Sequence, residues 1–182
     1  MSCSVSCPRE LVSQDSVSPG PIEPAETVAR GAYDPSHGKA GKATIKPAFI
    51  DKRALASSEL SIWRLGATPV GLPLPRLKAI MRITGGGRKL FAVGMALASD
   101  VRGVSLETTG HRALCVVDEC DCDQSGNKHP AHGHIKLCPH LEGGGLHADS
   151  PEIKELQLKL RHIFMQSLHL RFTSASSTSS AA

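Results

Sequence analysis

The spacing of apolar residues along the chain predicts a small set of helices and strands. Residues 60–65 place apolar side chains on both faces of an extended segment, with successive residues on opposite faces, which is typical of a strand. From Leu74 the apolar residues recur at helical spacing, Pro75 suits a first turn, and the glycines at 85–87 follow where a helix would end. Further short strands are expected at 44–46, 90–93, 113–117 and 134–138. The segment 113–117 is almost continuously apolar, so we expect it at the centre of a sheet.

The last predicted helix is the clearest element of the pattern. Ser150 can cap it, Pro151 fits its first position, and Glu155 and Lys159 form an i,i+4 pair on its polar side. The apolar stripe through about residue 172 consists of Ile153, Leu156, Leu160, Ile163, Phe164 and Leu168. Because strands and helices do not alternate strictly along the chain, we expect an α+β fold. It would be a small mixed or antiparallel sheet covered by this C-terminal amphipathic helix.

The composition divides the chain into three parts. Residues 1–26 are rich in Ser, Pro and Glu and predict a disordered leader, and residues 173–182 predict a disordered tail of Ser, Thr and Ala. Residues 27–172 would form a single α+β domain. The sequence has no apolar stretch near the ~20 residues of a membrane-spanning helix, so no membrane role is expected.

Charge and cysteine content narrow the function classes. The net charge of +4 is spread along the 182 residues, so it does not predict nucleic-acid binding. Aromatic residues make up 3% of the chain, few for a surface that stacks single-stranded bases. The first residues contain neither the basic region nor the apolar run of a secretory signal. We therefore expect a cytoplasmic protein whose six cysteines are reduced.

Residues 111–147 concentrate the metal-binding residue types, with four cysteines and six histidines. Zn²⁺ prefers four nitrogen or sulfur ligands supplied as close pairs. The candidate ligands are Cys120, Cys122, His132, His134, Cys138 and His140. None of these pairs has the C-x2-C spacing of a zinc knuckle, and surface histidines with ordinary cysteines explain the segment equally well.

A calcium site and a cysteine nucleophile in the same region have weaker support from the sequence. Residues 121–126 match the opening of a calcium-binding loop, but His132 stands where the bidentate Glu belongs. A cysteine nucleophile at Cys115, Cys120 or Cys138 would need a histidine beside it, which sequence spacing alone does not establish.

Four short motifs resemble a family of small, uncharacterised bacterial proteins. They are Val28-Ala-Arg30, Ile45-Lys-Pro-Ala-Phe49, Leu60-Ser-Ile-Trp-Arg64 and Pro130-Ala-His-Gly-His-Ile135. The family shares an Arg, a V-x-P-x-A-F segment, an L-S-V-x-R strand and a late H-A-x-I strand, and its activity is unknown. The resemblance implies site residues Arg30, Phe49, Ser61, Arg64 and His132. It also implies ordinary residues at positions 120, 122 and 138, which argues against a zinc site shared by the family.

Gathered at one sheet edge, the implied residues would form an anion pocket. Arg30 and Arg64 would clamp a phosphate or carboxylate, Ser61 would supply a hydroxyl, and His132 would titrate near neutral pH. A nucleotide, an RNA end or an ADP-ribose-like ligand would suit such a pocket. Alternatively, Arg64 pairs with Glu59 or Asp118, and His132 caps a strand.

Three function hypotheses follow. The favoured one is a small accessory protein that binds a protein partner or nucleic acid, because no motif matches a known catalytic constellation. The second is a small enzyme acting on a phosphate-bearing substrate, with His132 as general acid and base and Arg30, Ser61 and Arg64 around it. The third is a zinc-binding module built from the 111–147 segment.

Overall fold

The computed structural model of the chain describes residues 7–13, 18, 20–39, 44–65, 73–84, 88–119 and 129–169. The strands are β1 (Thr27–Asp34), β2 (Leu60–Leu65), β3 (Lys89–Leu97), β4 (Leu114–Val117), β5 (His132–Leu137) and β6 (Ser167–His169). The α-helices are α1 (Lys52–Ala56), α2 (Leu74–Thr84), α3 (Ala98–Arg102) and α4 (Pro151–Gln166). Two 3-10 turns, η1 (Pro8–Glu10) and η2 (Pro47–Phe49), complete the described elements.

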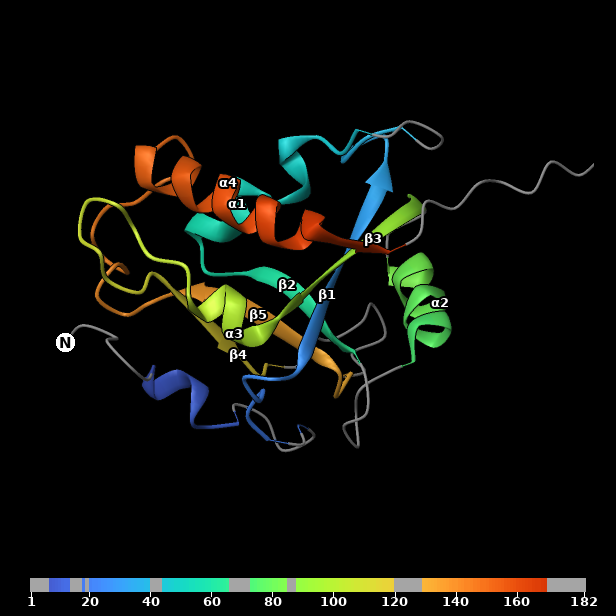
Figure 1. The fold of residues 1–182 in the computed structure, drawn as a ribbon, viewed down its shortest axis with the longest axis horizontal. Helices are drawn as coiled ribbons and strands as arrows, with labels where there is room; N and C mark the ends of the chain where they lie inside the picture. Colours follow the sequence, from blue (N-terminus) through green and yellow to red (C-terminus); the bar gives the residue numbers. More distant parts are fainter. Residues whose placement is uncertain are drawn as a thin grey trace, which may run out of the picture.

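The strands form one antiparallel sheet in the order β4-β5-β2-β1-β3-β6. Strand β1 crosses the middle of the molecule and pairs with β2 on one side and β3 on the other (Figure 1). Strands β4 and β6 form the two edges. The predicted α+β class is therefore confirmed, with an antiparallel sheet.

Helix α4 covers one face of this sheet, as its apolar stripe predicts (Figure 1). Its buried side chains are Ile153, Leu156, Gln157, Leu160 and Phe164. The ring of Phe164 meets that of Phe49 edge to face, with centroids 6.2 Å apart. Gly94 in β3 allows this close approach, because a Cβ there would lie 3.0 Å from the Phe164 carbonyl oxygen. Leu55 of α1 and Val101 of α3 belong to the same core.

Helix α2 covers part of the opposite face. Its Leu77 and Met81 are buried in a second, smaller cluster with Ala29, Leu90 and Val93. Strand β2 separates the two clusters by its alternation: Leu60 and Ile62 belong to the core under α4, and Trp63 and Leu65 to the cluster under α2. The sheet therefore has an α4 face and an α2 face.

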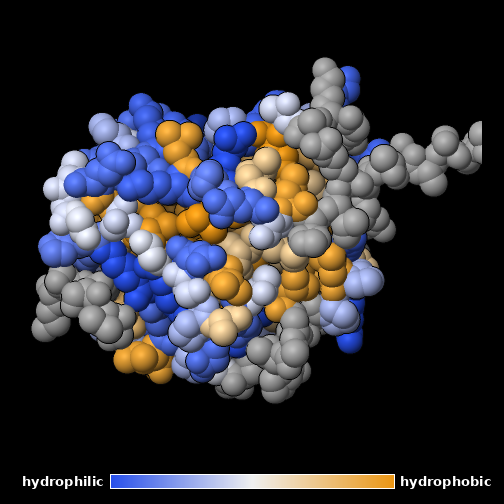
Figure 2. Space-filling model, viewed as in Figure 1, coloured by the Kyte–Doolittle hydropathy of each residue, from blue (hydrophilic) through white to orange (hydrophobic). Residues whose placement is uncertain are grey.

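The surface on the side viewed in Figure 1 mixes hydrophilic and hydrophobic residues. Figure 2 shows blue areas broken by orange ones on this side. Among the described residues, Leu158 of α4 is 58% exposed and Leu97 of β3 is 42% exposed. Scattered apolar residues of this kind are normal on a protein surface.

The strongest local patterns are confirmed. The strand at 60–65, the helix from Leu74 and the helix from Pro151 all form. The Glu155 and Lys159 side chains pair at 2.7 Å. The last helix ends at Gln166, earlier than predicted, because residues 167–169 pair with β3 as strand β6.

Two strand predictions need correction. Residues 44–46 do not form a strand, and Ile45 makes a single bridge to Gly38. The segment 113–117 does contain β4, but β4 is an edge strand and not a central one. Its four residues are all buried because neighbouring segments cover both of its faces. The continuous run of apolar residues therefore indicated that the strand is buried, and not that it lies at the centre of the sheet.

Parts of the leader expected to be disordered pack on the domain. We call residues 7–13, 18 and 20–26 the N-terminal segment. Cys7 and Ile22 are 0% and 2% exposed. Cys7 lies with Cys115 and Val117 in one cluster, whereas Ile22 belongs to the core under α4. Described residues of the segment therefore pack on both faces of the sheet near β4, and the domain boundary at residue 27 stays a prediction.

The structure also bears on the predictions about the cysteines and about membrane-spanning helices. Cys7 and Cys115 form a disulfide, so the prediction of reduced thiols is wrong for this pair. No helix among the described residues is long and apolar enough to cross a membrane. The cytoplasmic location stays a prediction, and the tail at 173–182 lies outside the described residues.

Candidate functional site

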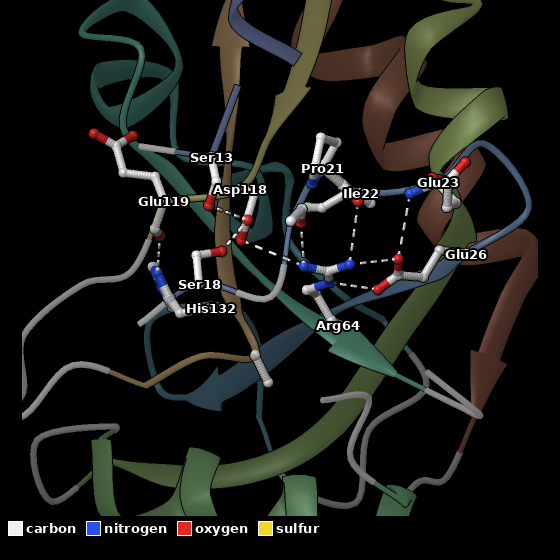
Figure 3. Close-up of polar contacts among 12 residues, drawn as sticks. Ser13, Ser18, Pro21, Ile22, Glu23, Glu26, Arg64, Asp118, Glu119 and His132 are labelled. Atoms are coloured by element: carbon white, nitrogen blue, oxygen red, sulfur yellow. Dashed lines mark hydrogen bonds and ion pairs between the residues drawn. The ribbon is translucent and has the colours of Figure 1, made fainter. Parts of the chain in front are cut away.

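Arg64 of β2 is the centre of a buried charge network (Figure 3). It is 3% exposed and binds the Glu26 carboxylate through two bonds, Nε to Oε1 at 2.5 Å and Nη2 to Oε2 at 2.8 Å. Its Nη1 also donates to Asp118 Oδ1 at 3.3 Å. Burial opposes the charge of Arg64, but hydrogen bonds and attraction from Glu26 and Asp118 outweigh it and raise the Arg64 pKa. The alternative that Arg64 pairs with Asp118 is confirmed.

The same network holds the N-terminal segment in place. The Arg64 guanidinium donates to the carbonyl oxygens of Gly20 at 2.9 Å and Pro21 at 3.4 Å. Asp118 accepts hydrogen bonds from the hydroxyls of Ser13 and Ser18 (Figure 3). The middle of the segment is therefore tied to Arg64 of β2 and to Asp118, which directly follows β4.

A second buried carboxylate, that of Glu10, lies at the outer edge of β4. One of its oxygens, Oε1, accepts from the Val116 N–H at 2.6 Å and from Arg102 Nε at 2.8 Å. The same oxygen also accepts from Arg112 Nη2. Burial alone would raise the pKa of Glu10, but Arg112, the Val116 N–H and Arg102 together lower it. Glu10 is therefore held as a carboxylate against an edge strand.

The two arginines also cover backbone carbonyls of the edge. Arg112 Nε donates to the Leu114 carbonyl at 2.8 Å, and Arg102 Nη2 donates to that of Val116 at 3.3 Å. Arg102 Nη2 also reaches the carbonyl of Ile22 at 2.6 Å. Arg102 Nη1 is buried and has no hydrogen-bond partner within the described part of the chain. We call this arrangement the β4 edge site: the outward backbone groups of Leu114 and Val116 with the Arg102 and Arg112 side chains.

The residues of the predicted anion pocket do not share one cavity. Arg30 donates hydrogen bonds to two backbone carbonyl oxygens, from Nε to that of Phe49 at 2.8 Å and from Nη1 to that of Ser61 at 2.6 Å. Burial lowers the pKa of Arg30 to about 10. Arg64 lies on the α4 face in the network described above. Neither guanidinium is arranged as the clamp that the sequence suggests.

Ser61 and His132 lie on the other side of the sheet. In β2 the buried positions are Leu60, Ile62 and Arg64, so Ser61 and Trp63 turn to the α2 face. His132 pairs with Trp63 across the strands, and their ring centroids are 5.1 Å apart. Its Nδ1 lies 3.2 Å from the Glu119 carbonyl oxygen (Figure 3). The enzyme hypothesis requires all four side chains in one pocket, and the strand alternation separates them.

The candidate zinc ligands are also dispersed. His132 and His134 are neighbours, with ring centroids 4.9 Å apart, and His134 Nδ1 lies 3.3 Å from Glu119 Oε2. Cys138 lies beside Cys115, and His140 lies against His111. Cys120 and Cys122 fall outside the described residues. Within the described ranges, no three His, Cys, Asp or Glu side chains are placed to hold one metal ion.

Sequence reasoning missed the residues that form the β4 edge site. Glu10 lies in a segment whose composition suggests disorder, and Arg102 and Arg112 look like ordinary surface charges. Their contacts with Glu10 span 92 and 102 positions of the chain. The presence of Cys7 within this segment was a usable signal, since a cysteine is among the most buried residue types.

Comparisons with known proteins add no family to this picture. No protein-family model, curated protein or solved structure matches the chain. The resemblance to small bacterial proteins therefore stays a prediction.

Replacing Arg64 tests the buried network. Arg64→Met leaves Glu26 and Asp118 buried without their cation, so we expect unfolding free energy to fall by about 3–5 kcal/mol in urea denaturation. The matched control is Asp149→Asn, which removes the exposed pair with Lys52 (3.1 Å) and should change the free energy of unfolding far less, because solvent screens an exposed ion pair. Equal losses in the two variants would contradict the assignment.

The pH dependence of Glu10 gives a second test. Because the folded protein lowers the Glu10 pKa below its ordinary 4.5, the ionised carboxylate stabilises the fold above that pH. We expect Glu10→Gln to be less stable than the parent by about 2 kcal/mol at pH 7, and this difference to shrink as the pH falls below 4.5. Urea denaturation at each pH measures it, with the exposed Glu59→Gln as control. A difference that stays constant down to pH 3 would refute the role of the charge.

Proposed function

We propose that this protein is a small interaction module that binds an extended, acidic segment of a protein partner along the β4 edge site. The observation that supports the proposal is the position of Glu10. Its carboxylate accepts the outward N–H of Val116 and lies between Arg102 and Arg112. The chain thus presents, in its own N-terminal segment, the chemistry that a ligand of this edge would need.

The N-terminal segment covers the edge without forming a strand. Beside β4 the segment forms the three-residue turn η1. Among the described residues, no ladder of backbone hydrogen bonds joins the segment to β4. A side-chain oxygen therefore stands where a paired strand would place a backbone carbonyl. An extended peptide can supply that carbonyl to Val116 and add main-chain bonds along the edge, as in other cases of strand addition.

Charge at the edge selects for an acidic partner. Two guanidiniums face one carboxylate, and all three side chains are at most 12% exposed. Arg102 Nη1 keeps a donor that no described residue uses. A partner with a second acidic group would satisfy that donor and balance the remaining charge.

Peptide binding tests the proposal. The full chain carrying Cys7→Ser and Glu10→Ala loses the disulfide and the carboxylate that hold the segment, so the edge becomes accessible. The probe is a fluorescent peptide of residues 7–13 with Cys7→Ser, and its binding is followed by anisotropy. We expect saturable binding, weakened at least about tenfold when the peptide carries Glu10→Gln, since a charge-assisted bond is worth about 1.5–3 kcal/mol.

Matched variants locate the binding surface. Adding Arg102→Gln or Arg112→Gln to the opened chain should abolish binding, whereas Arg53→Gln on the exposed side of α1 should leave it unchanged. Circular dichroism verifies folding, and the single variant Cys7→Ser serves if the double variant does not fold. Equal affinity for the Glu and Gln peptides would overturn the proposal. So would displacement of the peptide by a single-stranded oligonucleotide, which would favour nucleic acid as the partner.

A further inference from the structure

Three sulfur atoms meet beneath the N-terminal segment. Cys7 and Cys115 form a disulfide, and Cys138 Sγ lies 3.3 Å from Cys115 Sγ. All three residues are 0% exposed and, with Val117, make a small cluster of their own. The proposed binding of a peptide does not use the sulfur of Cys138.

The three cysteines differ in how the backbone holds them. Cys115 is part of β4, and Cys138 directly follows β5, where its N–H donates to the Ala113 carbonyl at 2.8 Å. Both are therefore fixed by the β4–β5 pair. Cys7 precedes the short turn η1 on the N-terminal segment. The disulfide consequently ties the segment to the sheet, and Cys138 is positioned next to the bond that does so.

We propose that these residues form a thiol–disulfide exchange site that releases the N-terminal segment. The Cys138 thiol loses its proton, and the thiolate attacks Cys115 Sγ. The new bond joins Cys138 and Cys115, the bond between Cys115 and Cys7 breaks, and Cys7 leaves as a thiolate that takes up a proton. One disulfide and one thiol exist before and after the step, so it needs no external oxidant or reductant.

Arg9 provides the charge that such a step requires. Its guanidinium is 2.6 Å from Glu142 Oε1 and also interacts electrostatically with Cys138. A nearby cation stabilises a thiolate relative to the thiol. Glu142 in turn accepts from the Ser58 hydroxyl at 2.9 Å, which fixes the carboxylate. Arg9 therefore lies two residues along the chain from the leaving cysteine, and its positive charge acts on the attacking one.

Exchange would change what holds Glu10 at the edge. With the disulfide in place, Cys7 keeps the neighbouring Glu10 beside Arg102 and Arg112. After exchange, residues 7–13 are held by non-covalent bonds alone and can be displaced. The consequence for partner binding rests on the proposed function, whereas the exchange itself does not.

Disulfide mapping tests the exchange directly. The full chain is incubated without reductant at pH 8, quenched in acid, alkylated and digested, and linked peptides are identified by mass spectrometry. We expect a Cys115–Cys138 linkage together with alkylated Cys7. The linkage should be lost in Cys138→Ser, which retains Cys7–Cys115. A second variant with Cys3→Ser, Cys120→Ser and Cys122→Ser leaves three cysteines and excludes exchange through the others.

The pH profile separates a chemical role of Arg9 from a structural one. Arg9→Gln should shift the pH of half-maximal exchange rate upward, because the thiolate loses its cation. Finding Cys7–Cys115 alone in the parent and in the three-cysteine variant, with Cys138 alkylated after unfolding, would overturn the exchange site. Peptide binding to the opened chain is measured separately, so failure of exchange and failure of the proposed function give different results.

Discussion

An edge strand can be buried only if its outward backbone groups find hydrogen-bond partners, and this requirement shapes one side of the molecule. All four residues of β4 are buried, yet within the described part of the chain no strand lies beyond it in the sheet. Glu10, Arg102 and Arg112 supply side-chain groups to the backbone of Val116 and Leu114 instead. An extended segment of a partner can replace the side chains that bond the outward backbone groups of β4. This replacement is the physical basis of the proposed interaction module.

The buried ion pairs and hydrogen bonds of Arg64 hold the N-terminal segment against the sheet. Glu26 binds Arg64 with its side chain, and its backbone carbonyl accepts from the Ala98 N–H at 2.9 Å, at the start of α3. Because Glu26 directly precedes β1, one residue joins the N-terminal segment, α3 and the central strand. Buried ion pairs add little net stability compared with apolar packing, but breaking one is costly. The network is therefore best understood as fixing where the segment enters the sheet.

The parts of the fold that the sequence revealed are those with local periodicity. Strand β2 and helix α4 repeat apolar residues at their own spacing, and both begin where predicted. Strand β1 contains Arg30 and Gly31 among small residues, so its alternation is weak although it is central. The β4 edge site depends on contacts between residues about a hundred positions apart, which no local pattern encodes. Motif spacing likewise could not show that Arg30 and His132 face opposite sides of the sheet.

Hydrogen exchange at the Val116 amide tests the central claim, that Glu10 takes the place of a strand. In antiparallel pairing the alternate residues Cys115 and Val117 direct their amides to β5, whereas Val116 points outward to Glu10. The account predicts that the Val116 amide is protected in the parent chain and loses protection in Glu10→Ala, while the Cys115 and Val117 amides keep theirs. An unprotected Val116 amide in the parent, or one unaffected by the substitution, would contradict it.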